Sequence, residues 1–460
     1  TIVAGVYVLS PDFKKITANS TPLTGGIDFS QVIKPFSGFD GGHQPYRICI
    51  SEDSRIFVSS GDKRSDNVIV WEIDKNNLNS WTPLIQGSTW NDEWQVTRNS
   101  SFYAGLNCSM DVTGSGSNLK LLLFSTNKTS AQGFVSDGFR LDEYSITSTG
   151  VFTGTPRKIS ALSGKYAVAY DNVNVIYDGK GGYWFGASRG ENITSQLNLL
   201  HVNADEKTTN NSYYKDALHG GAGLKVHHSS LGEDWLFKGI KMVDNEGQFR
   251  VWKIDYNNDA ARSKKFDVNS GNMKRNHNAF AIDYAENLFV VGNNGEKCHA
   301  YALPYCGTKT TPAAQNITLQ QPTQLNPFAY NLYTTQENDG LIALHFFLNA
   351  NADRVLIRLI DEKGNKYLLR DYPTQDSEKD YVPYNDDGFK TIITKEDIER
   401  LNLPLNGTYT WEVEVNGNSV DAPTELPMSY GFYHPSSVDI DNNPENESFG
   451  LIIANEAMHK

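Results

Sequence analysis

Hydrophobic and polar residues alternate along most of the first 304 residues, in short runs that each end in an acidic or Asn-rich turn. A period of two residues is typical of β-strands that bury one face. Helical periodicity is almost absent. The strand-and-turn phrase occurs at Val6–Asp12, Val68–Asp74, Leu197–Asp205 and Arg250–Asp255, and in a weaker form at Phe139–Tyr144. The pattern therefore predicts an all-β protein.

The phrase belongs to a longer repeat. A unit of two strands joined by a polar turn precedes each internal copy, as in Tyr46–Ser60 and Phe280–Gly292. The units begin near residues 46, 104, 165, 221 and 279, so the period is about 56 to 61 residues. Repeated four-stranded units with few helices favour a β-propeller with long loops. A β-sandwich lacks so long a repeat, and a parallel β-helix has much shorter rungs.

The two ends of the chain complement each other. Thr1–Asp12 reads as the third strand of a blade, whereas Ser437–Asn443 and Phe449–Ala454 read as a first and a second strand. We therefore expect about six blades, the last one composite and closed by pairing of the N- and C-terminal strands, which removes exposed edges. The propeller would comprise residues 1–307 and 431–460. The alternative is a fragment cut in mid-blade from a longer tandem protein.

Residues 312–430 interrupt this repeat. Thr308–Pro322 has the composition of a linker, and short alternating strands such as Arg354–Ile360 and Thr410–Val415 follow it. One short helix is expected at Thr394–Leu401, with Thr394 as its N-cap. About 115 residues of such strands predict an immunoglobulin-like β-sandwich, inserted before the last blade segment.

Several stretches resemble a known group of proteins. They are Pro45–Asp53, Ser163–Asp171, Gly181–Arg189, Ala281–Leu288 and Asp441–Gly450. The resemblance is to secreted or surface-attached proteins of Bacteroidetes-type bacteria, in which an NHL- or WD-like propeller carries an immunoglobulin-like insert. It covers most of the chain. It implies this architecture and an extracellular or outer-membrane surface location, and it transfers no catalytic residues because the group is largely uncharacterised.

Charge and hydropathy exclude some classes of protein. The 460 residues carry 41 Lys and Arg against 54 Asp and Glu, a net charge of −13, which argues against a nucleic-acid partner. No apolar run approaches the roughly 18 residues that a transmembrane helix needs, although a lipid anchor upstream stays open. Cys49, Cys108, Cys298 and Cys306 are too few for a disulfide scaffold. We expect mostly buried free thiols, but Cys298 and Cys306 are close enough to pair.

Four histidines form the first candidate site. His43, His219, His277 and His434 each precede a predicted innermost strand. Such strands line the central channel of a propeller, so the four imidazoles could meet at one mouth and bind zinc. The alternative is that repeats place similar residues at equivalent turns for structural reasons.

An aromatic loop forms the second candidate site. Trp90, Asp92, Glu93 and Trp94 lie between two repeat units, where a loop is exposed. Aromatic rings stack on sugars while amides and carboxylates bind hydroxyl groups, which suits glycan recognition. Tyr183 and Trp184 would extend this ligand-binding platform. The alternative is that the rings fill gaps between blades.

No catalytic motif stands out. Asp439–Asn443 resembles the start of a calcium loop, but Pro444 and Gly450 occupy positions where an EF-hand has Gly and Glu. Calcium or zinc is therefore an open expectation, and no cofactor is certain. No nucleophile elbow, zinc-protease motif or nucleotide-binding fingerprint is present.

The sequence favours a non-catalytic extracellular binding or scaffolding protein of the bacterial surface, with a glycan or a cell-surface protein as its partner. The chain would more readily be a binder than an enzyme. One alternative is a metal-dependent enzyme acting on extracellular glycan or peptide at the channel mouth. Another is a structural subunit of a surface assembly.

Overall fold

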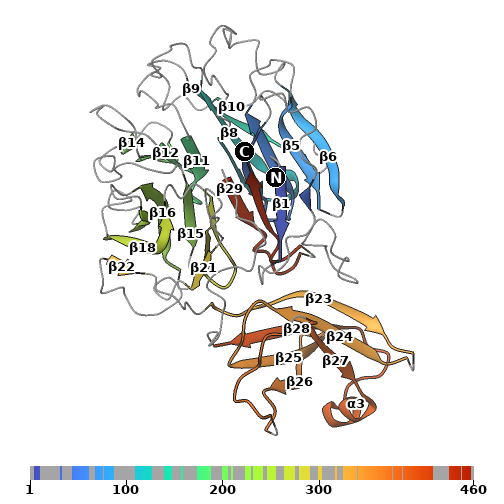
Figure 1. Cartoon of the computed structure of the whole chain (residues 1–460). Helices are drawn as coiled ribbons and strands as arrows, with labels where there is room; N and C mark the ends of the chain where they lie inside the picture. Colours follow the sequence, from blue (N-terminus) through green and yellow to red (C-terminus); the bar gives the residue numbers. More distant parts are fainter. Residues whose placement is uncertain are drawn as a thin grey trace.

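The computed structural model shows a protein built almost entirely of β-strands, in the two parts that Figure 1 displays. The structure describes residues 5–10, 32–33, 44–61, 68–75, 77–86, 109–126, 139–147, 157–158, 173–187, 199–205, 209–210, 223–228, 232–241, 246–254, 264–274, 279–290, 299–302, 316–318, 325–338, 340–375, 377–385, 387–417, 435–446 and 448–456. Within these ranges, helix is limited to α3 (Lys395–Leu401) and one short 3₁₀ turn (Gly116–Asn118). No helix there is long and apolar enough to span a membrane.

The larger part consists of small sheets that follow one another along the chain, each named here by its first strand. The β3 sheet contains β3 (Gln44–Ile50), β4 (Ile56–Gly61), β5 (Val68–Asp74) and β6 (Asn77–Gln86). The β7 sheet contains β7 (Ser109–Thr113), β8 (Lys120–Thr126), β9 (Phe139–Ser145) and β10 (Arg157–Lys158). The β11 sheet contains β11 (Val173–Tyr177), β12 (Tyr183–Ala187), β13 (Leu199–Val202) and β14 (Thr209–Asn210).

Two further sheets continue the series. The β15 sheet contains β15 (Leu224–His228), β16 (Asp234–Lys241), β17 (Glu246–Lys253), β18 (Lys264–Lys274) and β22 (Asn316–Thr318). The β19 sheet contains β19 (Phe280–Ile282), β20 (Asn287–Val290) and β21 (His299–Ala302). Strand β22 pairs with β18 in parallel. These residues, which the sequence assigned to the inserted domain, therefore extend a sheet of the larger part.

The β29 sheet joins the two ends of the chain. It contains β29 (Pro435–Ile440), β30 (Ile452–Glu456), β1 (Gly5–Leu9) and β2 (Val32–Ile33), in that order. Strands β1 and β30 are antiparallel, with Gly5 opposite Glu456 and Leu9 opposite Ile452. The predicted pairing of terminal strands in one composite sheet is confirmed. It covers edges that both strands would otherwise leave open.

The first strands of these sheets contact one another in sequence. Strand β29 contacts β3, β3 contacts β7, β7 contacts β11, β11 contacts β15, and β19 contacts β29. Hydrophobic side chains fill the space between neighbouring sheets, as where Phe57 and Val70 pack with Leu121 and Leu123. The expectation of an all-β, propeller-like fold is confirmed at this level. The number of blades remains a prediction.

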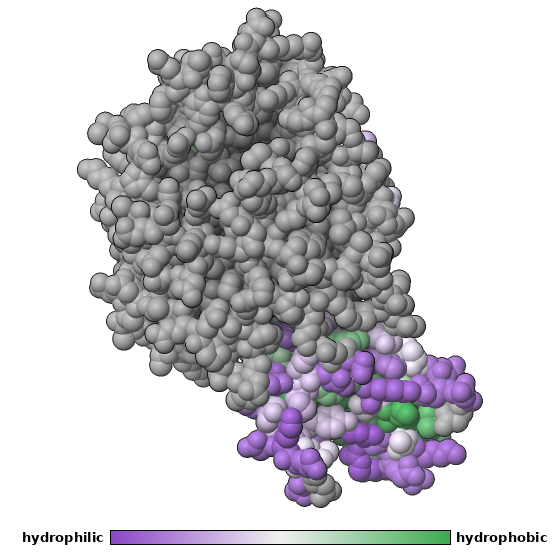
Figure 2. Space-filling model, viewed as in Figure 1, coloured by the Kyte–Doolittle hydropathy of each residue, from purple (hydrophilic) through white to green (hydrophobic). Residues whose placement is uncertain are grey.

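The smaller part is a two-layer module within residues 325–417. One layer contains β23 (Ala329–Gln336), β24 (Ile342–Leu348) and β27 (Phe389–Ile393). The other contains β25 (Arg354–Asp361), β26 (Lys366–Tyr372) and β28 (Tyr409–Asn416). Leu344 and Phe346 of the first layer share one core with Val355, Ile357 and Leu359 of the second. Figure 2 shows that the described surface of this module is mostly hydrophilic, with smaller hydrophobic areas between the hydrophilic ones.

Aromatic packing and amide hydrogen bonds attach the module to the larger part. Phe328, Tyr330 and Phe347 belong to the same hydrophobic cluster as Phe449, which lies in the turn between β29 and β30. The Asn287 side chain donates to the carbonyl of Asn326 at 2.9 Å and accepts from its N–H at 2.7 Å. These contacts fix where the chain enters the module.

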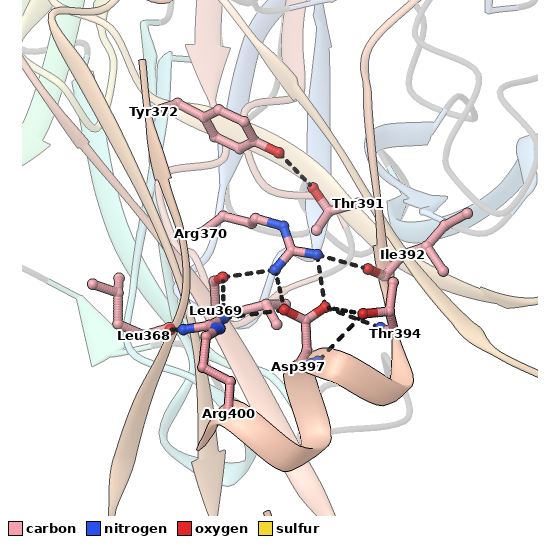
Figure 3. Close-up of polar contacts among 9 residues, drawn as sticks. All are labelled: Leu368, Leu369, Arg370, Tyr372, Thr391, Ile392, Thr394, Asp397 and Arg400. Carbon is pink, nitrogen blue, oxygen red and sulfur yellow. Dashed lines mark hydrogen bonds and ion pairs between the residues drawn. The ribbon is translucent and has the colours of Figure 1, made fainter. Parts of the chain in front are cut away.

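An ion-paired network anchors α3 to the module's sheet (Figure 3). Thr394 caps the helix and forms a capping box with Asp397, as the sequence predicted for this helix. Arg370 on β26 donates to both carboxylate oxygens of Asp397, at 2.6 and 2.7 Å, and Arg400 donates at 3.0 Å. Burial alone would raise the pKa of Asp397, but the hydrogen bonds from Arg370, Thr394 and Arg400 hold that pKa well below its usual value.

We expect Asp397→Asn to lower the free energy of unfolding by about 3 kcal/mol at pH 7, because the buried end of the Arg370 guanidinium then loses its counter-ion. The pKa of Asp397 is lower in the folded chain, so this contribution is present above pH 4 and declines as the pH falls further. Urea unfolding at pH 7 and pH 3 measures both effects. Asp371→Asn, in an exposed pair with Arg354, is the control and should change stability by less than about 1 kcal/mol. Equal losses in the two variants would contradict the prediction.

The composite sheet predicts a selective cross-link. Val6 lies opposite Asn455 in the β1–β30 pairing. Opposed residues of antiparallel strands have Cα atoms about 4.5–5.5 Å apart, which suits a disulfide. The Val6→Cys/Asn455→Cys variant should therefore form the bond under mild oxidation, as peptide mapping would show. The Val6→Cys/Ile453→Cys pair is two residues out of register and should not. Equal cross-linking in both would rule out this register.

Candidate functional site

Polar side chains on the first strand of one sheet accept hydrogen bonds from backbone N–H groups on the first strand of another sheet. This arrangement positions the candidate site. On β29, Ser437 Oγ accepts the N–H of Ile48 at 3.1 Å, and Asp439 Oδ2 accepts the N–H of Ile50 at 2.8 Å. Both donors belong to β3. A first strand has no further strand on its inner side, so its N–H groups need such partners. The carboxylate of Asp439 is held in place by this bond.

The same arrangement of hydrogen bonds occurs between the β7 and β11 sheets. Ser109 Oγ on β7 accepts the N–H of Val175 at 3.0 Å, and Asp111 Oδ2 accepts the N–H of Tyr177 at 2.7 Å. Both donors belong to β11. In each case a Ser-x-Asp sequence on one strand binds alternate N–H groups of its neighbour. Two carboxylates are thereby fixed on inner strands, each with one oxygen held by the backbone.

A lysine links these carboxylates electrostatically. Lys225 on β15 donates from Nζ to Asp439 Oδ1 at 2.7 Å, and this pair joins the β15 and β29 sheets. The Lys225 side chain is 34% exposed and that of Asp439 is 10% exposed, so solvent reaches the pair. Burial alone would lower the pKa of Lys225, but the charges of Asp439 and Asp111 outweigh it and raise that pKa. Lys225 is therefore a permanent cation.

Asp111 is the group of this set that titrates near neutral pH. Burial raises its pKa to about 6, even though Lys225 and the Tyr177 N–H both favour the ionised form. The charge of Asp439 adds to the increase. A carboxyl group with such a pKa can donate and accept a proton under ordinary conditions. We name Asp111, Lys225 and Asp439 the inner-strand cluster.

Cys49 borders the cluster but is not activated. Its thiol donates to the carbonyl of Met110 at 3.1 Å and lies 3.9 Å from Asp111 Oδ1. Burial, followed by the negative charge of Asp111, raises its pKa well above the usual value. The thiol is therefore protonated at neutral pH and is no nucleophile. The expectation of a buried free thiol is confirmed for Cys49, while Cys108, Cys298 and Cys306 lie outside the described residues.

A histidine and a glutamate lie beside the cluster. His227 is two residues after Lys225 on β15, so both side chains occupy the same face of that strand. Nε2 of His227 is 3.4 Å from Oε1 of Glu286, in the turn between β19 and β20. Both side chains are largely buried. The polar groups that approach this face of β15 thus come from the β19 and β29 sheets.

The sequence-based sites have different outcomes. The histidine set His43, His219, His277 and His434 and the loop residues Trp90, Asp92, Glu93 and Trp94 all lie outside the described residues, so both sites remain predictions.

Tyr183 and Trp184 are described, and they are core residues. Both are almost fully buried on β12, and the Trp184 ring packs against His201 at 4.4 Å between ring centroids. Their assignment to an exposed sugar platform is therefore not supported. A second strand is covered by sheets on both faces, which buries either side-chain direction.

The aspartates of the calcium-like loop contact hydrogen-bond donors of this chain, and calcium or zinc binding stays a prediction. Asp441 accepts hydrogen bonds from the hydroxyls of Ser54 and Ser448 and from the N–H of Asn443, while Asp439 binds Lys225. In each of these contacts the carboxylate accepts a hydrogen bond from a donor of this chain, and the bonds of Asp441 connect neighbouring turns. Among the described residues, no three His, Cys, Asp or Glu side chains gather into a group that could hold a metal ion.

Sequence reasoning missed the inner-strand cluster. The Ser-x-Asp pattern at Ser109–Asp111 and Ser437–Asp439 was the available signal, because both fall in predicted first strands. Lys225 carried no signal of its own. Its role depends on the proximity of Asp439, which is 214 residues away in the chain.

Comparisons with known proteins are limited to fold likeness. No protein-family model matches the chain, and no curated protein matches its sequence. Similar solved structures include a luciferin-regenerating enzyme, with 11% identity, a TM-score of 0.36, and coverage of 84% of this chain and 95% of that one. A thermostable family-43 glycoside hydrolase has 11% identity, a TM-score of 0.29, and coverage of 61% and 96%.

The extracellular domain of a hybrid two-component system from B. thetaiotaomicron is also similar, with 10% identity and a TM-score of 0.31. The alignment covers 80% of this chain and half of that one. At these values the likeness defines no activity. The expectation that the chain is more readily a binder than an enzyme is corrected to this extent: the similar solved structures are mostly enzymes, glycoside hydrolases and glucose dehydrogenases among them, so their fold gives a binder no preference. The specific bacterial group that the sequence resembles remains a prediction.

The inner-strand cluster predicts a stability effect that depends on pH. Lys225→Met leaves the carboxylates of Asp439 and Asp111 without their cation, so we expect unfolding free energy to fall by about 2 kcal/mol at pH 8. The loss should be smaller at pH 5, because burial raises the pKa of Asp111 to about 6, so that this group is then largely protonated in the folded chain and needs no cation. Urea unfolding at both pH values measures this difference.

Lys366→Met is the matched control. Lys366 pairs with Glu412 on the exposed face of the module, so its loss should cost less than about 1 kcal/mol at either pH. A Lys225→Met protein as stable as the wild type at pH 8 would show that the ammonium does not hold the cluster together.

Proposed function

We propose that this chain is an extracellular carbohydrate-active protein that performs acid–base chemistry on a glycan at the inner-strand cluster. The observation that carries the proposal is the arrangement of these side chains: the Tyr177 N–H fixes the Asp111 carboxyl group, and Lys225 binds Asp439. The charges of Lys225 and Asp439 act on Asp111, and burial raises its pKa to about 6. Strongly perturbed ionisable groups that solvent can reach are typical of functional sites.

The three groups suit hydrolysis of a glycosidic bond. Such hydrolysis uses one protonated carboxyl group as the acid and a second, ionised carboxylate. Asp111 is the group that holds a proton up to about pH 6, so we assign it as the general acid. Asp439 accepts a hydrogen bond from the Lys225 ammonium at 2.7 Å, and we assign it as the second carboxylate. Lys225 would bind substrate hydroxyl groups and stabilise the charge of the site.

The wider architecture in this proposal is a six-bladed propeller with an immunoglobulin-like module. Six sheets can be followed through the described part of the larger domain, and the two layers of the module share one core. The loop of Trp90, Asp92, Glu93 and Trp94 would add a surface for sugar stacking. An extracellular location is compatible with the chain's acidity and with the absence of a membrane-spanning helix among the described residues.

The test is hydrolysis of a panel of chromogenic glycosides, followed by a glycan array for binding. We expect Asp111→Asn to lower kcat by a factor of about 10²–10⁴, because an amide cannot donate the proton. The wild-type rate should fall as the pH rises above about 6, where Asp111 loses its proton. Asp371→Asn is the control, since this carboxylate lies in the module and pairs with Arg354.

Two results would contradict the proposal. One is a wild-type protein that neither cleaves any glycoside nor binds any glycan. The other is an Asp111→Asn variant with full activity and an unchanged pH profile.

A further inference from the structure

A repeated hairpin in this protein uses one residue with a left-handed backbone. In each case the N–H of the first turn residue donates to the carbonyl of the fifth, and the fourth residue has a positive φ. The hairpins are Ser51–Arg55, Asp178–Gly182, Asp283–Asn287, Glu337–Leu341 and Asp361–Asn365. Glycine occupies the fourth position in three of them, as Gly181, Gly340 and Gly364. Glycine is favoured there because it has no Cβ to clash.

Glu286 is an exception to this rule. Its φ is 64°, at the fourth position of the Asp283–Asn287 hairpin. A residue with a side chain is strained in this conformation, because its Cβ approaches the following carbonyl oxygen. Ser54 is the other exception, with a φ of 62°, and its hydroxyl binds Asp441. A side chain at this position is therefore kept for what it contacts.

The carboxylate of Glu286 carries a second cost. It is 8% exposed, and it lies close enough to Asp283 to help raise the pKa of that residue to about 7, an increase due mainly to burial. Two carboxyl groups near one another in a buried turn are unfavourable. Neither cost is needed to form the hairpin, because the same turn forms elsewhere in this chain with glycine.

His227 is what Glu286 contacts on the β15 sheet. Its Nε2 is 3.4 Å from Glu286 Oε1, and the edge of its ring meets the Phe237 ring at 6.5 Å between centroids. Leu224 and Val226 face the opposite way, into a hydrophobic cluster. His227 thus shares the face of β15 from which Lys225 reaches Asp439.

We propose that Glu286 and His227 form a second functional pair of the inner-strand cluster, in which Glu286 positions His227 to bind a hydroxyl group of the glycan. The Glu286 carboxylate is 3.4 Å from Nε2 and forms no hydrogen bond with it, but its negative charge favours the tautomer with the proton on Nε2. Nδ1 is then the hydrogen-bond acceptor of the ring, and a sugar hydroxyl is a donor of matching chemistry. Glu286 is a positioning residue in this scheme. The inference rests on the proposed function and adds two binding residues to it.

The alternative is that the pair merely ties the β15 and β19 sheets together. The two roles predict opposite changes in stability for one substitution. Glu286→Gly relieves the strained backbone and removes a buried charge, so a pair kept for function should give a more stable protein with weaker ligand binding. A structural pair should give a less stable protein.

The experiment compares the full chain with its Glu286→Gly, Glu286→Gln and His227→Gln variants. Melting temperature is measured for each, along with affinity for the best glycan on the array and kcat and KM for the best chromogenic glycoside. We expect Glu286→Gly to melt about 2–4 °C higher and to lose roughly tenfold in affinity. His227→Gln should lose a similar factor in affinity. Glu286→Gln removes the charge but keeps the strained backbone, so it should lose a similar factor in affinity and gain less stability than Glu286→Gly.

Glu362→Gln is the matched control, because Glu362 is exposed and belongs to the Asp361–Asn365 hairpin of the module. It should change neither quantity. A lower melting temperature for Glu286→Gly would overturn the inference in favour of a structural tie. Unchanged affinity in Glu286→Gly or His227→Gln, in a protein that binds glycan, would overturn it and leave the proposed function standing. A wild-type protein without any glycan binding or cleavage would overturn both.

Discussion

The backbone at the inner edge of each sheet sets the constraint on which the larger part of this protein depends. A first strand has a sheet neighbour on one side only, yet its N–H groups are taken out of water by the sheets around them. Ser437 and Asp439 on one strand, and Ser109 and Asp111 on another, provide the missing acceptors for the strand alongside. Hydrophobic packing brings the sheets together, and these bonds fix how the first strands meet.

The same constraint places charge in the interior. Serine can satisfy an N–H without charge, but each aspartate brings a carboxylate to a site where solvation is reduced. Lys225 compensates Asp439 directly, whereas Asp111 forms no ion pair within the described part of the chain and has a pKa of about 6 because it is buried. A structural device thereby creates a group with the acidity that proton transfer needs. The candidate site is thus a consequence of how the fold is held together.

Glu286 illustrates the opposite case, in which a local preference is overridden. The hairpin turns of this chain favour glycine at the left-handed position, and three of them have it. At the turn that faces His227, the chain retains a buried carboxylate despite the backbone strain and the nearby Asp283. Because glycine is the usual residue at this turn position, a glutamate there stands out. Such a departure from local preference needs a compensating contact elsewhere in the structure.

Alternation and capping depend on neighbouring residues, so the strands, the repeat and the capped helix at Lys395–Leu401 could be predicted from local patterns in the sequence. The pairing of the two chain ends could be predicted as well, because each end carries part of one four-stranded unit. Burial was harder to predict. Tyr183 and Trp184 have the composition of a sugar-binding surface, and only packing between sheets shows them to be core residues. The inner-strand cluster was decided by tertiary structure alone: Lys225 and Asp439 are 214 residues apart, and no local pattern records that the closing of the sheets brings their charges together.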